Sequence, residues 1–379
     1  MHAVNSSRPH VARRVRGLGG AHGFSMLELM IAMAIMGVVL ASTLGGLSDA
    51  TKANAAVLNV TGMNGSLRAG MDLLVRDMLQ VGSGLPPGHV LLTPSGTNST
   101  AVRLPGPPGT TFTMTAGDVD LGAVVPMPGA GPTVNGVATD VLVTMMADNT
   151  FLNVPLTAMT STTVDVSTGL NIATGPDRVS AGQLMMVQKG ATTTLLQVTS
   201  VNTANNRLTF ADGDSLNLNQ SLAAAGNLTA LNAADPANTP SACTISRVRM
   251  VTYYLDATTD PAHPRLVRRI NNGNATTFNN TLGNATAIDI ENLQFSFDLV
   301  DGNTNPANVR MTTADRNGTG SCAPNPCTEA QIRKVNIALT GRSQNAVNRT
   351  QRAFRNTLVS QVSFRGMAFI DEYRAPAAP

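Results

Sequence analysis

Residues 29–47 form a run of 19 positions without a charged side chain. A helix rises about 1.5 Å per residue, so this run approaches the ~30 Å hydrocarbon thickness of a bilayer. The segment therefore predicts a membrane-spanning helix near the N-terminus. The arginines that precede it, with no acidic residue among them, are Arg8, Arg13, Arg14 and Arg16. By the positive-inside rule, we expect the N-terminus in the cytoplasm and the bulk of the chain across the membrane.

A short motif joins the basic leader to the apolar run. It reads Gly23-Phe24-Ser25-Met26-Leu27-Glu28-Leu29. A secretory signal peptide is cut after its apolar region, whereas here the recognisable junction comes before it. The pattern resembles the prepilin peptidase site of type IV pilins and type II secretion pseudopilins. The resemblance implies cleavage between Gly23 and Phe24 and N-methylation of Phe24. An uncleaved anchor, or a signal peptide cut after Ala41, are the alternatives.

Glu28 places a carboxylate at the edge of the apolar segment. A charge there is costly in lipid and usually has a partner. One interpretation is an interfacial glutamate that snorkels to the lipid headgroups. The resemblance to pilins implies another, in which Glu28 pairs with the α-amine of a neighbouring subunit during filament assembly. Cleavage would create that amine on Phe24.

The charge balance and the motifs exclude several classes of function. The chain carries 26 Lys+Arg against 23 Asp+Glu, but without the leader arginines the balance is 22 against 23. The basic pI is therefore mainly a leader effect, and with 3% aromatic residues it gives no support for nucleic-acid binding. The sequence has no Walker A, G-x-S-x-G or H-E-x-x-H motif, so we expect neither an enzyme nor a cofactor.

No metal site is expected from the acidic residues or the histidines. Asp212 and Asp214, like Asp298 and Asp301, lack the spacing of a calcium loop and are interpreted as solvated turn acids. The histidines outside the leader, His89 and His263, lie near no cysteine in the sequence.

The chain contains three cysteines. Cys322 and Cys327 flank Ala-Pro-Asn-Pro, a turn-forming stretch, and the periplasm is an oxidising compartment. We therefore predict a local disulfide between them. Cys243 is then left over, either as a buried thiol or as an alternative partner for one of the other two.

The first helix is predicted to continue beyond the membrane to residue 80. Apolar side chains recur there at helical spacing, namely Leu67, Met71, Leu74 and Met78. Arg68, Asp72 and Arg76 follow one another at i, i+4 spacing and indicate a wetted flank. The Gly- and Pro-rich residues 82–88 end the helix.

Strands are predicted in the remainder of the chain from apolar runs and from apolar–polar alternation, at 140–146, 183–188, 194–201, 205–210, 247–255, 265–269, 288–297 and 332–340. Residues 212–240 lack a clear period and predict a loop. We expect the adjacent Tyr253 and Tyr254 to lie one in the core and one on the surface, because successive strand residues face opposite ways.

The C-terminal strands carry a second resemblance. The pattern YYL…LVRR…IENLQFSF…IRKVNIALTGRS, with residues 354–365, resembles PilW-type minor pilins and J-type minor pseudopilins. Together the features predict an α+β protein with a long helix on a β-rich periplasmic lobe. The expected regions are a basic prepilin leader 1–23, a transmembrane half-helix 24–47, an amphipathic half-helix 48–80, a loop- and β-rich insertion 81–240, and an antiparallel pilin-like region 241–379.

The resemblance implies a minor pilin that joins, and helps to prime, a type IV pilus grown from the inner membrane. The implied partners are other minor and major pilins or pseudopilins, prepilin peptidase and the inner-membrane assembly platform. Two alternatives remain at this point: a minor pseudopilin of a type II secretion system, and an adhesive or DNA-capturing tip subunit whose insertion binds a ligand.

Overall fold

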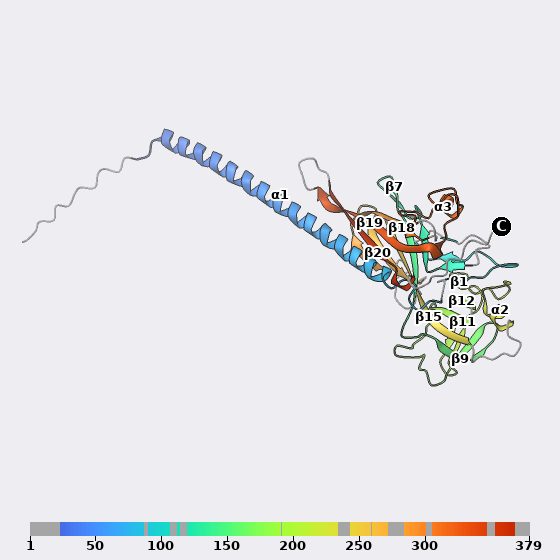
Figure 1. Cartoon of the computed structure of the whole chain (residues 1–379). Helices are drawn as coiled ribbons and strands as arrows, with labels where there is room; N and C mark the ends of the chain where they lie inside the picture. The colour runs from blue at the N-terminus through green and yellow to red at the C-terminus, as the bar shows by residue number, and fades with distance from the viewer. Residues whose placement is uncertain are drawn as a thin grey trace, which may run out of the picture. The chain divides into compact units, whose positions relative to one another are not determined.

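The protein has an α+β fold with a long apolar N-terminal helix and a β-rich body (Figure 1). The computed structural model describes residues 23–86, 90–106, 112–113, 120–190, 192–233, 243–258, 260–271, 284–300, 305–346 and 353–367. The chain divides into two compact units, residues 1–55 and residues 56–379.

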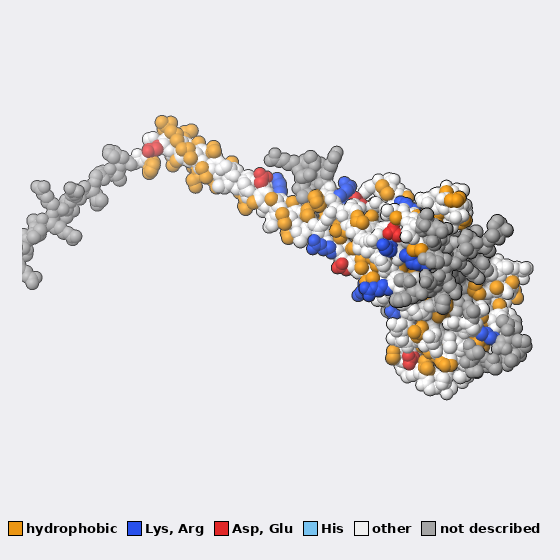
Figure 2. Space-filling model, viewed as in Figure 1, with side chains coloured by type: hydrophobic (Ala, Val, Ile, Leu, Met, Phe, Trp, Pro, Cys, Tyr) orange, Lys and Arg blue, Asp and Glu red, His pale blue; other side chains and the backbone are white. Residues whose placement is uncertain are grey.

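The first unit contains the start of helix α1 (Met26–Met78). Every described residue up to position 55 is exposed, including large apolar side chains such as Met30, Ile35 and Leu44. Figure 2 shows these hydrophobic side chains along the N-terminal part of the helix. Among the described residues, α1 is the helix long and apolar enough to span a membrane, and its most apolar window has no buried residue. The predicted apolar helix is therefore confirmed, with a surface suited to lipid.

In the second unit, the C-terminal part of α1 packs on β-sheets through the predicted apolar stripe. Leu67, Leu74 and Met78 are fully buried and Met71 nearly so, whereas Arg68, Asp72 and Arg76 are exposed. This confirms both the core face and the wetted flank. The helix approaches the sheet closely at Gly70, which has no side chain. A β-carbon at this position would lie 2.9 Å from that of Ala287.

A three-stranded antiparallel sheet lies against this part of the helix (Figure 1). Its strands are β18 (Ile290–Leu299), β19 (Ile332–Ala346) and β20 (Ala353–Ser363). The register pairs Phe295 with Ile337, and Ile337 with Ser360. Alternate residues of β18 and β19 are buried, as predicted from their alternation. Gly341 of β19 leaves room for Leu67, whose Cγ would lie 2.9 Å from an added β-carbon.

The larger sheet is built around β15 (Cys243–Asp256), which pairs with four other strands, all antiparallel to it. Those strands are β8 (Val141–Ala147), β9 (Val154–Met159), β11 (Leu184–Lys189) and β16 (Arg265–Ile270). The sheet extends through β1 (Val90–Leu92), β4 (Asp120–Gly122), β5 (Val124–Met127), β10 (Thr163–Val166), β12 (Thr192–Gln197), β13 (Ser200–Asn202), β14 (Arg207–Thr209) and β17 (Asn284–Ile288).

The remaining elements are short. Two-stranded sheets form from β2 (Arg103–Leu104) with β3 (Phe112–Thr113) and from β6 (Thr133–Val134) with β7 (Val137–Ala138). The other helices of the described residues are α2 (Leu228–Ala233), α3 (Thr313–Arg316) and the 3₁₀ turns η2 (Glu329–Gln331) and η3 (Arg365–Met367).

Both faces of the central strands are buried, in separate apolar clusters. In β11, Leu184 and Met186 face the core shared with α1, whereas Met185 and Val187 face a second core among β9, β10, β12, β14 and α2. The prediction for the tyrosine pair is therefore wrong, because Tyr253 and Tyr254 are both fully buried. Tyr253 faces the α1 core, and Tyr254 packs with Val141 and Val267 on the other face.

The loop predicted at 212–240 is present over 212–227, but the prediction is wrong at 228–233, which form α2. The rest of the predicted loop, beyond 233, lies outside the described residues. Asp214 in this loop is not a solvated turn acid, since it is 8% exposed. Its carboxylate accepts backbone N–H bonds from Leu216, Leu218 and Asn219 at 2.7–3.2 Å. Burial raises the pKa of Asp214, and these three bonds act against that rise. Asp214 therefore stabilises the conformation of this loop. Asp298 also accepts a hydrogen bond, from Asn336 Nδ2 at 3.0 Å. Asp301 lies outside the described residues.

Candidate processing and assembly site

The bond between Gly23 and Phe24 precedes the helix. Residues 23–25 have no regular secondary structure, and α1 begins at Met26. Phe24 is 82% exposed, and no heavy atom lies within 4 Å of the place where a β-carbon on Gly23 would sit. A peptidase needs an accessible bond outside a helix, because the helical backbone cannot enter an extended binding cleft. The local geometry at this junction meets both conditions.

Ser25 sets the first turn of α1. Its Oγ accepts the backbone N–H of Glu28 at 3.1 Å, and its carbonyl accepts that of Leu29 at 3.1 Å. Ser25 is therefore the N-cap and Glu28 the third helical residue. This cap was not among the predictions, although the Ser-x-x-Glu spacing is its usual signal.

The Glu28 carboxylate is exposed in the first helical turn. An acid there interacts favourably with the helix dipole, which is positive at the N-terminus. Within the described residues Glu28 forms no ion pair, whereas Lys52 and Asp49 further along the helix lie 3.9 Å apart. The carboxylate is thus available to a cation outside the chain.

Besides the apolar stripe, a buried charge of α1, Asp77, binds side chains of the body. Its side chain is 4% exposed, and Oδ2 accepts bonds from Arg268 Nε at 2.5 Å and from the Tyr253 hydroxyl at 2.7 Å. Burial first, and then the charge of Asp77, raise the pKa of Tyr253 far above its ordinary value, so the phenol stays protonated and donates. This contact was not predictable from the sequence, because both partners of Asp77 lie more than 170 residues away.

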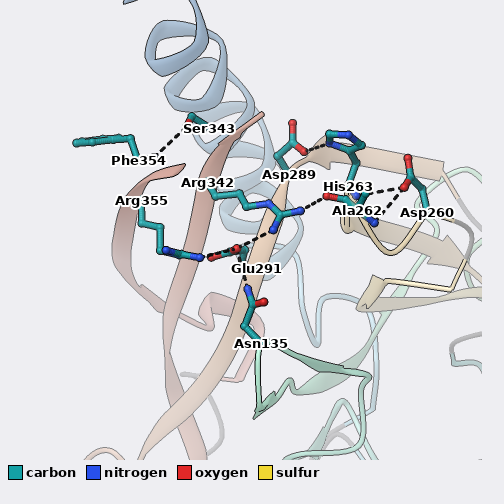
Figure 3. A network of polar contacts seen from close by, with 10 residues as sticks. All are labelled: Asn135, Asp260, Ala262, His263, Asp289, Glu291, Arg342, Ser343, Phe354 and Arg355. Atoms are coloured by element: carbon teal, nitrogen blue, oxygen red, sulfur yellow. Dashed lines mark hydrogen bonds and ion pairs between the residues drawn. The ribbon is translucent and has the colours of Figure 1, made fainter. Parts of the chain in front are cut away.

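A second polar network ties β20 to β18 across β19 (Figure 3). Glu291 accepts bonds from Arg355 Nε at 2.6 Å, Arg342 Nη1 at 3.2 Å and Asn135 Nδ2 at 2.7 Å. Burial acts to raise the pKa of Glu291, but the hydrogen bond and charge of Arg355, with the charge of Arg342, outweigh it and lower that pKa. Beside this network, His263 Nδ1 lies 2.6 Å from Asp289 Oδ1.

Two of the three cysteines are joined, and the third lies in another part of the body. Cys322 and Cys327 are joined by a disulfide, with their Cα atoms 5.7 Å apart and both residues buried. The adjoining turn is fixed by Asp315, which accepts the backbone N–H of Ser321 at 2.7 Å. Cys243 is buried in the second core, whereas the disulfide belongs to the α1 core. This separation explains why Cys243 is outside the bridge.

A hollow of about 280 Å³ in the described part of the insertion is lined by neutral residues that include Asn171 and Asn206. Asn206 donates to the carbonyls of Ser167 and Leu170, and Asn171 donates to Thr174, so both amides serve their own loops. The described residues also contain no group of three side chains able to hold a metal ion.

Residues 19–44 match the family model of the prokaryotic N-terminal methylation motif. The match covers the junction, Glu28 and the first part of α1. The chain carries the motif of type IV pilin-like proteins. This motif implies processing by prepilin peptidase and assembly with other pilins. No curated protein and no solved structure matches the chain.

Proposed function

We propose that the protein is a minor pilin of a type IV pilus, of the PilW-like kind, which takes part in priming filament assembly. The observation that carries this proposal is the combination at the N-terminus. An accessible Gly23–Phe24 bond stands directly before a helix whose surface is apolar and exposed, with the carboxylate of Glu28 in its first turn. An ordinary membrane anchor requires neither the junction nor the carboxylate.

The proposed topology follows from the charge of the leader. We place the N-terminus in the cytoplasm, the first half of α1 in the inner membrane and the body in the periplasm. The disulfide between Cys322 and Cys327 supports an oxidising location for the body.

We assign the body two parts, an insertion at 81–240 and a pilin-like region at 241–379. The three-stranded sheet on α1 belongs to the second part. β15 also belongs to it, yet pairs with β8, β9 and β11 of the insertion. The insertion therefore enlarges a sheet that the pilin-like region begins.

The processing step is tested by N-terminal sequencing of the full chain recovered from membranes of its host. We expect the mature protein to begin at a methylated Phe24. Gly23→Leu should leave the leader in place, because a bulky side chain before the cleaved bond does not fit the peptidase. Gly20→Leu, upstream of the junction, is the matched control and should be processed. A mature N-terminus at Ser42 would contradict the proposal.

Filament membership is tested by shearing surface filaments from cells and probing them for the chain. The motif is shared by pilins and by pseudopilins of type II secretion, so a deletion strain is also required. Loss of surface pili with normal secretion of exoproteins supports the pilus assignment. Normal pili with a secretion defect would instead assign the chain to the secretion system.

A further inference from the structure

The three-stranded sheet has two edges, and the protein closes only one of them within the described residues. At the β18 edge, Phe297 and Val309 exchange both backbone hydrogen bonds, at 2.8 and 2.9 Å, and Leu299 N–H donates to the Pro306 carbonyl at 2.8 Å. At the other edge lies β20, an 11-residue strand that pairs with β19 alone.

The register shows which backbone groups of β20 face outward. Phe364 N–H donates to the Arg333 carbonyl at 2.9 Å, just beyond the last paired residue of β20. Backbone direction alternates along a strand, so the even-numbered residues of β20 bond to β19 and the odd-numbered ones point away. Thr357, Val359 and Gln361 therefore direct their N–H and C=O groups outward. Within the described residues, no hydrogen bond is made to these groups.

β20 also lacks the features that normally protect an exposed edge. Sheets avoid unwanted pairing by placing proline, bulges or unpaired charge on their edge strands. The sequence Ala353–Ser363 contains no Pro, Gly, Lys, Asp or Glu. Its single charge, Arg355, is directed along the sheet to Glu291 at 2.6 Å (Figure 3). Val359, near the middle of the strand, is 74% exposed.

We infer that β20 is a docking edge that takes an extended segment of a neighbouring pilin-like subunit as a fourth strand of this sheet. Outward N–H and C=O groups in a row are complementary to another extended backbone and to little else. The inference rests on the proposed function, because a filament holds neighbouring subunits beside one another. The side chains of Thr357, Val359 and Gln361 are uncharged, so we expect the incoming strand to place uncharged side chains beside them.

A second copy of the chain does not fit this edge equally well. If β20 paired antiparallel with β20 of a second copy, the elements along the two sheets would run in opposite directions. The parts of α1 packed on those sheets would be opposed in the same way. In the proposed filament, neighbouring subunits share the direction of their helices, so pairing of β20 with β20 of a second copy does not meet this requirement. The occupant is therefore a segment other than β20, and we assign it to a pilin-like subunit of a different kind.

Val359→Pro is the decisive variant. It removes one outward N–H and places the proline ring in the path of an incoming strand, but it breaks no bond to β19, and edge strands tolerate proline in this position. Val359→Thr keeps the N–H and the β-branched shape and is the matched control. Both are made in the full chain, in the native host. We expect the amount of the proline variant in sheared filaments to fall about tenfold, which corresponds to ~1.4 kcal/mol of association free energy. The amount of the control variant should stay near the wild-type level.

Two further measurements make the outcome unambiguous. Thermal unfolding in detergent should be alike for both variants, and amide exchange over residues 355–363 should slow when the wild-type chain passes from detergent into filaments. Equal incorporation of the two variants, or unchanged exchange, overturns the inference and leaves the proposed function standing. Absence of the wild-type chain from filaments overturns both. Disulfide-linked homodimers of Val359→Cys in filaments would identify a second copy as the occupant and overturn the assignment to a different subunit.

Discussion

Replacing Asp77 with alanine should loosen the attachment of α1 to the body. The substitution removes the acceptor of both Arg268 and Tyr253 and leaves a guanidinium with 19% of its side chain exposed. Breaking a buried ion pair by removing one partner costs about 3–5 kcal/mol. Because Arg268 keeps some access to water, we expect a loss of free energy of unfolding near the lower end, about 3 kcal/mol.

The loss is measured on the full chain in detergent by thermal unfolding, where about 3 kcal/mol corresponds to roughly 4 °C in a body of this size. Asp72→Ala is the matched control, because Asp72 is exposed on the same helix and should shift stability by less than about 0.5 kcal/mol. The double variant Asp77→Leu, Arg268→Met should recover much of the loss, since an apolar pair leaves no buried charge unpaired. Equal melting of Asp77→Ala and Asp72→Ala would refute the reasoning.

Three further predictions concern other residues. Glu28→Ala should insert in the membrane and fold yet be depleted from filaments, measured by shearing, and normal incorporation would favour the snorkelling interpretation. Non-reducing peptide mapping should recover Cys322 linked to Cys327, and reduction should cost about 2 kcal/mol or less because the loop is short; a link from Cys243 to either would contradict this. The pKa of Glu291 is lower in the folded than in the unfolded chain, so its contribution to stability is complete above about pH 5 and is lost as pH falls through the folded pKa. Glu291→Gln should reduce the loss of unfolding free energy between pH 7 and about pH 3. An unchanged pH dependence in the variant would count against the network.

Much of the fold could be predicted because its signals are local. The helix follows from an uncharged apolar run joined to a stripe at helical spacing, and Leu67 and Leu74 are buried as that spacing requires. The strands β11 and β12 were also predictable from their apolar runs. The strands β18 and β19 were predictable from their alternation, since a strand with one buried face shows period two. The Gly23–Phe24 junction and Glu28 were identified from the motif alone, and the family model covers the same residues.

The errors fall where burial depends on residues distant in sequence. One of Tyr253 and Tyr254 was expected on the surface, but β15 is covered on both faces and both side chains are buried. Asp214 looked like a solvated acid, but its own loop folds around the carboxylate. Periodicity describes which residues share a face, and it does not say whether a second layer covers the other face.

The sequence by itself determined the membrane-capable helix, the processing motif and the strands, because each depends on spacing within a few residues. Only the tertiary structure decided that Asp77 would meet Arg268, that the larger sheet would divide two cores, and that β20 would present its outer edge. These outcomes depend on which strands become neighbours. That choice is made by the packing of whole faces against one another, and no local pattern in the chain records it.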